Sequence, residues 1–245
     1  MRNRNFKIDK NICYLCGLLG ADTKDHVPPK SLFATEKQRL TLPAHKKCNN
    51  EFAEDEEYFR DINVNQAAAL KMKNVDTIIE KIARSWEDKG RNRFKKIMAT
   101  AEHVNVKLSS GEVTKYIKVK PDPEKLKQIA IKIARGVVYN DTGVITHQSS
   151  YSSFYLPITE VSKVRSKDKE ELFWKAMGQE SCLHSIYGPH FGARRIYLLS
   201  EKQNEKYTIT CMMSLILGSA FYVVIIFFFH DEIRKKELEI FIPSL

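Results

Sequence analysis

Apolar side chains in the middle of the chain recur at the three- and four-residue spacing of an amphipathic helix. The residues from Ile78 to Trp86 follow this pattern and predict a helix that ends near Gly90. Residues 91–101 predict a second helix. Residues 102–120 alternate between apolar and polar side chains around a Ser-Ser-Gly turn, which predicts a β-hairpin.

The best-defined helix signal begins at Asp122, whose carboxylate can accept hydrogen bonds from the first backbone N–H groups of a helix. Pro123 follows at the first helical position, where its missing N–H does no harm. The apolar residues after it form one stripe and predict a helix with one buried face. They are Leu126, Ile129, Ala130, Ile133, Ala134, Val137 and Val138. The polar, Ser-rich segment from His147 to Ser153 is expected to be a loop.

A long uncharged segment between Lys206 and His230 allows two interpretations. Its length suffices to span a bilayer as a helix. Against this, Gly218-Ser219 suits a two-residue turn, and the β-branched and aromatic run after it favours a strand. We therefore expect two buried strands joined at Gly218, with the upstream residues 194–200 in the same sheet, and no membrane insertion.

The charge of the chain changes the picture more than its hydrophobic content does. A hydrophobic content of 43% is ordinary for a folded protein and argues against disorder. The net charge of +10 indicates attraction to polyanions such as nucleic acids. The excess lysines could equally solvate exposed helix faces, so charge alone leaves this question open.

Two ligand pairs near the N-terminus have the spacing of zinc knuckles. Cys13 and Cys16 form one pair, and His45 and Cys48 form the other. Together they supply the four donors of a closed, structural Cys3His zinc site. The alternative is a set of buried free cysteines with His45 at the surface. An odd cysteine count and no visible secretory leader favour metal over disulfides and a reducing, cytoplasmic location.

Between the two pairs stands Asp25-His26, followed by Val27 and two prolines. A carboxylate beside an imidazole can hold a divalent ion and present a neutral base next to it. Asn49 comes directly after Cys48 and offers an amide oxygen, a hard ligand suited to magnesium or manganese.

These residues, in this order, resemble the HNH endonucleases, whose catalytic unit is the ββα-metal fold. The resemblance covers roughly residues 10–60. The segments TKDHVPPKSLF and PAHKKCNNEFAEDEEYF are similar to a bacterial subgroup with a larger C-terminal extension. The resemblance implies that His26 is the general base and that Asp25 and Asn49 bind a catalytic Mg²⁺ or Mn²⁺. Zinc would hold these three residues together.

Two positions depart from the family pattern. His45 stands where many relatives have Cys, and it remains a competent zinc ligand. The middle Asn of the motif has no counterpart, and Gln38 is the nearest amide. The acidic residues from Glu54 to Glu57 could add a metal ligand or form a solvated helix face.

Other polar residues carry weaker signals. Cys182, His184 and His190 could suggest a second metal site, but their loose spacing favours polar loop residues. The basic residues elsewhere could contact phosphates or form ordinary surface charge. They are Lys132, Arg135, Arg194 and Arg195.

We therefore expect an α+β protein. An N-terminal zinc-bound ββα-metal (HNH) module would occupy residues 1–62, and an extension of helices and antiparallel strands would occupy residues 63–245. The implied function is hydrolysis of phosphodiester bonds in DNA, with RNA as a second candidate substrate, in an antiphage defence or mobile-element system. The extension would grip the substrate, form a homodimer or dock to a protein partner. The main alternative is a non-catalytic zinc-knuckle module that binds nucleic acid or protein. A membrane-anchored effector is the third.

Overall fold

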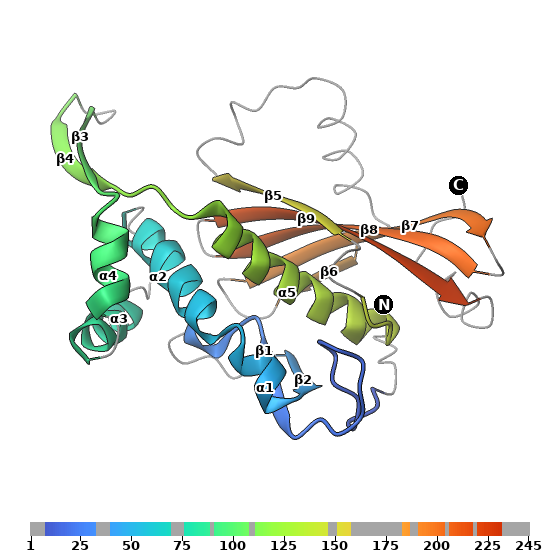
Figure 1. The fold of residues 1–245 in the computed structure, drawn as a ribbon. Helices are drawn as coiled ribbons and strands as arrows, with labels where there is room; N and C mark the ends of the chain where they lie inside the picture. The colour runs from blue at the N-terminus through green and yellow to red at the C-terminus, as the bar shows by residue number, and fades with distance from the viewer. Residues whose placement is uncertain are drawn as a thin grey trace.

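The computed structural model describes residues 8–32, 40–69, 76–88, 91–107, 111–146, 151–157, 183–186, 191–203, 206–217 and 220–231. Within these ranges the chain is a mixed helix and strand protein whose paired strands are all antiparallel (Figure 1). This architecture agrees with the α+β class expected from the sequence.

The N-terminal part is a short β-ribbon followed by helices. Its elements, in chain order, are β1 (Thr23–Val27), the 3₁₀ helix η1 (Lys30–Leu32), β2 (Leu40–Ala44), α1 (Lys46–Asn50) and α2 (Ala53–Ala69). β1 and β2 pair antiparallel, with Asp25 opposite Leu42 and His26 opposite Thr41. We call these two strands the N-terminal ribbon.

The helices and the hairpin predicted for the middle of the chain are present. They are α3 (Asp76–Asp88), α4 (Arg91–Met98), β3 (Glu102–Lys107) and β4 (Val113–Lys118). Gly90 and the two serines of the predicted turn lie outside the described residues. Asp61 of α2 ties this part to the rest, because its carboxylate accepts hydrogen bonds from Trp86 Nε1 at 2.9 Å and from Arg93 Nε at 2.8 Å.

The helix predicted from Asp122 onward is α5 (Pro123–Thr142). The Asp122 carboxylate accepts a hydrogen bond from the backbone N–H of Glu124 at 3.0 Å, as expected of an N-cap. Gly143 ends the helix with a φ of 69°, a conformation that glycine adopts without strain. The predicted start of the helix is therefore confirmed by its capping geometry.

The C-terminal sheet has the strand order β5-β9-β8-β7-β6 in the described part of the chain. Its strands are β5 (Tyr151–Pro157), β6 (Leu183–Ile186), β7 (Phe191–Gln203), β8 (Lys206–Leu217) and β9 (Ala220–Asp231). β8 and β9 pair antiparallel, with Leu217 opposite Ala220, which confirms the two predicted strands; Gly218 and Ser219 lie outside the described residues. The segment 194–200 lies in β7 and pairs with β8, as predicted. Within the described ranges no helix is long and apolar enough to cross a membrane.

One expectation for this region is wrong. The loop predicted from His147 to Ser153 is wrong for its last three residues, which begin β5 and pair with β9, and residues 147–150 lie outside the described residues. The apolar residues opposite them explain the difference. Ser152 pairs with Ile225 and Ser153 with Val224, so a strongly strand-forming partner recruits a polar segment to the edge of the sheet.

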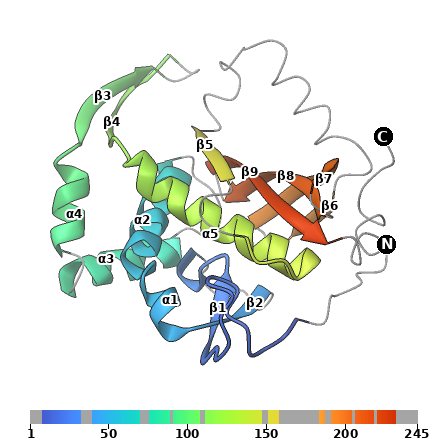
Figure 2. The same ribbon diagram turned by 45° about the vertical axis from the view of Figure 1, so that its right-hand side comes forward.

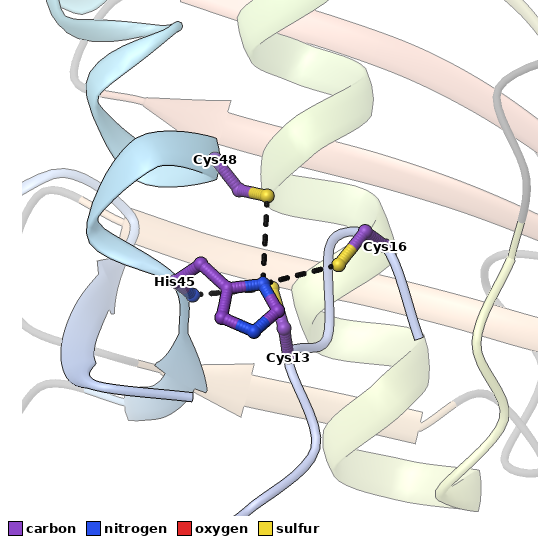
Figure 3. Close-up of side chains that lie close together, drawn as sticks. All are labelled: Cys13, Cys16, His45 and Cys48. Carbon is purple, nitrogen blue, oxygen red and sulfur yellow. Dashed lines mark hydrogen bonds between the residues drawn. The ribbon is translucent and has the colours of Figure 1, made fainter. Parts of the chain in front are cut away.

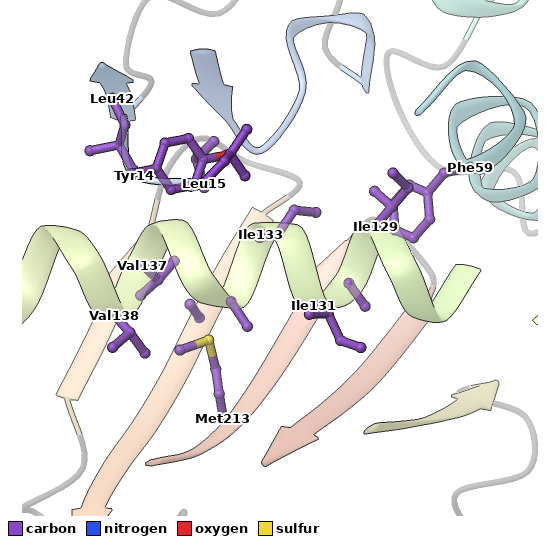
Figure 4. Close-up of a cluster of buried hydrophobic side chains, with 14 of the residues drawn as sticks. Tyr14, Leu15, Leu42, Phe59, Ile129, Ile131, Ile133, Val137, Val138 and Met213 are labelled. Carbon is purple, nitrogen blue, oxygen red and sulfur yellow. The ribbon is translucent and has the colours of Figure 1, made fainter. Parts of the chain in front are cut away.

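Helix α5 lies between two layers. Figures 1 and 2 show it crossing the C-terminal sheet, with the N-terminal ribbon on its other side. It contacts β5, β8 and β9 on the sheet side, and α2 and β1 on the other. In Figure 4, Tyr14 and Leu42 lie on one side of α5, whereas Met213 lies on the sheet side. Every residue from Ile129 to Tyr139 is consequently buried, so α5 is covered well beyond its predicted stripe.

A single cluster of buried apolar side chains runs through both layers. It joins Tyr14 and Leu42 from the N-terminal part to Ile129 and Val137 of α5, and to Met213 of β8. The boundary expected after residue 62 falls inside α2. The two parts therefore share one core across α5.

Gly136 marks the closest approach of α5 to the N-terminal ribbon. A Cβ atom at this position would lie 2.8 and 2.9 Å from the Val27 methyl groups and 3.2 Å from Leu42. Replacement of Gly136 by Val should therefore lower the free energy of unfolding by about 1–3 kcal/mol or more, as overpacking does. Urea titration would measure it.

The matched control is Gln128→Val on the exposed side of the same helix. It carries only the small helix-propensity penalty of valine, less than about 1 kcal/mol. Equal losses for both variants would contradict the close packing at Gly136.

Candidate functional site

Four metal-ligand side chains meet at the start of α1. The sulfur atoms of Cys13, Cys16 and Cys48 and a ring nitrogen of His45 all lie within 4.8 Å of one another (Figure 3). Cys13 and Cys16 come from a loop that we call the knuckle (residues 12–19), whose ends pair as an isolated bridge. A hydrogen bond of 2.8 Å from the Gly17 N–H to the Cys13 carbonyl tightens its turn.

The ring of His45 is oriented by both of its nitrogens. Nδ1 lies 3.3 Å from the Cys16 sulfur and 3.8 Å from the Cys48 sulfur. Nε2 lies 3.0 Å from the carbonyl oxygen of Leu19, to which a protonated Nε2 would donate. This carbonyl favours the tautomer in which the Nδ1 lone pair faces the sulfurs, the usual arrangement of a metal-binding histidine.

The thiols of Cys13 and Cys48 have pKa values that are shifted in opposite directions. Burial and the neighbouring sulfurs of Cys16 and Cys13 raise the pKa of Cys48 to about 12. Burial opposes ionisation of Cys13 too, but hydrogen bonds from backbone groups, that of His45 foremost, leave its pKa lowered. A divalent ion would remove the repulsion among the sulfurs. The cluster can therefore hold a metal such as zinc, whose preferred structural donors are Cys and His in this number.

The knuckle also supports Asp25. Tyr14 lies between the two cysteines, and its hydroxyl donates a hydrogen bond of 2.6 Å to Asp25 Oδ2. Burial, followed by the charge of Asp25, raises the pKa of Tyr14 well above its ordinary value. The phenol thus stays protonated and donates to the carboxylate. In this way the loop that carries two metal ligands also fixes a carboxylate of β1.

A lysine from α5 gathers the oxygen atoms of the candidate site. Lys132 Nζ lies 2.8 Å from Asp25 Oδ2 and 3.0 Å from Asn49 Oδ1. It also forms an ion pair with Glu56 Oε1 of α2. The side chain of Lys132 is only 2% exposed, so this ammonium group is held inside the protein.

The surroundings of Lys132 account for its burial. The three oxygens match the three N–H donors of an ammonium group. The ring of Phe52 lies 5.0 Å from Nζ, within the range of a cation–π contact. Burial raises the pKa of Glu56, and the charge of Lys132 partly offsets this effect. The cluster thus holds a buried positive charge against two carboxylates and an amide.

Arg135 fastens α5 to the knuckle one helical turn further on. Its Nη2 donates a hydrogen bond of 2.5 Å to the carbonyl oxygen of Leu15. Tyr139 follows on the same side of α5, with its ring centroid 6.2 Å from that of Tyr14. The sequence allowed Lys132 and Arg135 to be surface charges, but both are buried, with 2% and 5% exposure.

His26 is placed differently from Asp25. Along β1, Asp25 and Val27 are buried, Lys24 is exposed and His26 is half-buried. Successive side chains of a strand point to opposite faces, so His26 lies on the face of the ribbon that carries Thr41. The structure therefore brings Asp25 and Asn49 to one point, with His26 on the other face of the strand.

The remaining predicted residues divide among several places. Of the acidic residues after Asn49, Glu56 turns toward Lys132, Asp55 pairs with Lys125 at 2.9 Å, Glu57 pairs with Arg93, and Glu54 is exposed. His184 lies in β6 opposite Arg194, and is thus in a strand instead of a loop. Gln38, Cys182 and His190 lie outside the described residues.

Sequence reasoning missed Tyr14 and underrated Lys132 and Glu56. One signal was present for the lysine, because Lys132 and Arg135 interrupt a run of apolar residues in α5 that is otherwise fit for a core. A charged residue in such a run is either at the surface or paired inside. No local pattern marks Tyr14, since its partner Asp25 comes from a different element.

Loss of one sulfur ligand should release the metal. The Cys16→Ser variant is expected to lose its zinc and unfold the N-terminal part, because roughly 10 kcal/mol or more of zinc-binding energy contributes to folding in such sites. Elemental mass spectrometry, together with circular dichroism, would measure both effects. Wild-type protein should contain one zinc per chain.

The matched control is Cys211→Ser, which alters a buried cysteine of β8 outside the cluster. This variant should retain its zinc even if its stability falls. Folded wild-type protein without zinc would contradict the assignment, as would a Cys16→Ser variant that retains its metal.

No protein-family model, curated protein or solved structure matches the chain. The resemblance to HNH endonucleases therefore rests on the motif residues. To these the structure adds their arrangement: a metal-ligand cluster at the start of α1, and Asp25 and Asn49 converging on one cationic group. These observations carry the functional argument.

Proposed function

We propose that the chain is a metal-dependent endonuclease of the HNH type that hydrolyses phosphodiester bonds in DNA. One observation carries the proposal. Asp25 and Asn49, the residues that the resemblance marks as ligands of the catalytic ion, point at the same cation, 2.8 and 3.0 Å from Lys132 Nζ. They come from different elements, and their convergence is what a shared ion requires.

The arrangement of elements supports the same proposal. β1 and β2 form an antiparallel pair, and α1 follows with Asn49 near its end. This is the order of a ββα-metal unit. In this interpretation the Cys3His cluster is structural, because all four tetrahedral positions are taken by protein ligands. It fixes Asn49 directly, through the preceding Cys48, and Asp25 through Tyr14.

The donors fit a hard divalent ion. Carboxylate and amide oxygens are the ligands that magnesium and manganese prefer, and Asp25 and Asn49 supply one of each. When bound, such an ion would supply charge stabilisation for the scissile phosphate. His26 would accept the proton of the attacking water. The phosphate and the water would have to lie where the ribbon exposes His26, at the end of β1.

The charge of the chain suits a polyanionic substrate. A net charge of +10 would favour association with DNA through contacts to its phosphates. The C-terminal sheet and the β3–β4 hairpin are then available for substrate grip, self-association or docking to a protein partner. A role in antiphage defence or in a mobile element follows only from the resemblance.

A non-catalytic module that binds nucleic acid or protein is the second candidate. Two observations favour it. The ammonium of Lys132 lies among the oxygens that would bind the ion, and His26 occupies the other face of β1 from Asp25. In this case the Lys132 cluster would be purely structural, holding α5 to the ribbon. Divalent-dependent cleavage separates the two candidates.

Loss of the proposed base should remove activity and leave the fold intact. Cleavage of plasmid DNA by His26→Ala should fall by a factor of about a hundred to ten thousand, the usual contribution of a positioned general base. Zinc content and DNA affinity should stay as in the wild type. A gel assay with Mg²⁺ and with Mn²⁺ would measure the cleavage rate.

The control is His103→Ala, an exposed histidine of β3, which should cut at the wild-type rate. Asn49→Ala should instead lose metal affinity, so that added Mn²⁺ partly restores its cleavage. Cleavage by His26→Ala at the wild-type rate would contradict the role of His26 as the general base. Wild-type protein that cuts no nucleic acid with either metal would favour the non-catalytic module.

Binding to DNA should weaken steeply with salt. Several phosphate contacts predict a loss of about a thousandfold in affinity between roughly 50 and 200 mM salt. Fluorescence anisotropy with a labelled duplex at several salt concentrations would measure the slope. Affinity that does not depend on salt, or no binding at all, would shift the weight to a protein-docking role.

A further inference from the structure

The ammonium group of Lys132 lies among the oxygens that the proposed function assigns to the divalent ion. The ammonium contacts three side-chain oxygens, and two of them belong to the proposed ligands of the divalent ion. It reaches them from α5, well outside the segment that resembles an HNH unit. The lysine is therefore an internal cation placed where the ion's ligands converge.

We propose that Lys132 competes with the catalytic divalent ion for Asp25 and Asn49, and that it must leave them when the ion binds. This inference rests on the proposed function, because that function supplies the ion. Lys132 would then act as a built-in counter-ion that keeps the site closed at low metal concentration. It would be neither a ligand of the ion nor a catalytic residue.

Distances and charge both argue that the two cations exclude each other. Nζ is 2.8 Å from Asp25 Oδ2 and 3.0 Å from Asn49 Oδ1, whereas magnesium binds oxygen at about 2.0–2.1 Å. An ion on these same oxygens would lie within a few ångströms of the ammonium. Because the site is buried, water screens this repulsion poorly. The stronger cation for carboxylate and amide oxygens would displace the weaker one.

Glu56 can keep its ion pair with Lys132 after the lysine has left Asp25 and Asn49. The Glu56 side chain is 19% exposed, against 5% for Asp25, so it lies toward the outer side of the cluster. The flexible stem of a lysine can keep its contact with Glu56 while its head group leaves Asp25. The ion pair with Glu56 then retains Lys132 near the site, ready to return when the ion dissociates.

The test is the affinity for Mn²⁺ of the full-length, zinc-loaded protein. Lys132→Met keeps the length of the side chain and removes its charge. It should bind Mn²⁺ at least about tenfold more tightly than the wild type, because the competing cation is gone. Titration followed by electron paramagnetic resonance measures free Mn²⁺ directly. Unchanged or weaker binding would overturn the proposal and make Lys132 a residue that positions Asp25.

The matched control is Lys125→Met. Lys125 lies on the same helix and forms one ion pair, at 2.9 Å, with Asp55 of α2. Its loss removes an equal charge and a contact between the same two helices, but no contact to Asp25 or Asn49. Its affinity for Mn²⁺ should match that of the wild type. A similar gain in both variants would mean that overall charge sets the affinity, and this result too would overturn the proposal.

A second measurement uses the wild type, in case Lys132→Met leaves the Asp25 carboxylate without a countercharge and fails to fold. Amine acylation read by mass spectrometry should modify Lys132 slowly without divalent ions. Saturating Mn²⁺ should raise its rate of modification at least about fivefold and leave that of Lys125 unchanged, since a lysine held by three oxygens is shielded. Lys132 that stays protected at every Mn²⁺ concentration would refute displacement.

These results separate the competition from the nuclease function. Tighter Mn²⁺ binding by Lys132→Met, with no cleavage by any variant, would support the competition and reject the nuclease. Cleavage by the wild type with Mn²⁺ affinity unchanged in Lys132→Met would support the nuclease and reject the competition.

Discussion

A buried ammonium group keeps its charge only where oxygens replace its water, and the placement of Lys132 imposes this condition on four elements at once. β1 must present Asp25, α1 must present Asn49 and α2 must present Glu56, all to one atom of α5. Removing Asp25 or Glu56 would leave the ammonium with one carboxylate, and removing Asn49 would cost it one hydrogen-bond acceptor. Lys132 therefore joins the ribbon, the first helices and α5 at one point, in addition to the core that they share.

The loop that carries Cys13 and Cys16 also contacts Asp25 and α5. Tyr14, inside the knuckle, donates to the same Asp25 oxygen that Lys132 contacts, and Arg135 holds the knuckle carbonyl of Leu15. The knuckle and Lys132 therefore both hold Asp25, and the knuckle is in turn held by α5 through Arg135. A change in the Cys3His cluster would reach Asp25 through the hydrogen bond from the Tyr14 hydroxyl.

Much of the fold was predictable because its signals are local. The capping pair at Asp122 and Pro123 set the start of α5, and the β-branched run after Gly218 identified β9. The meeting of the three cysteines with His45 followed from spacing within two short segments. What could not be predicted depends on contacts between distant segments. Ser152 joins a strand because Ile225 lies opposite, and Lys132 is buried because three other elements bring oxygens to it.

The wide separation between Lys132 and its partners also sets an order of events during synthesis. Asp25 and Asn49 leave the ribosome long before α5 does, since their contacts with Lys132 span 107 and 83 residues. Until then the ribbon lacks both its countercharge and its cover over Val27 and Leu42. The growing chain thus carries an incomplete and exposed ribbon, and the arrival of α5 completes the contacts of Asp25 and Asn49 with Lys132 and the core together.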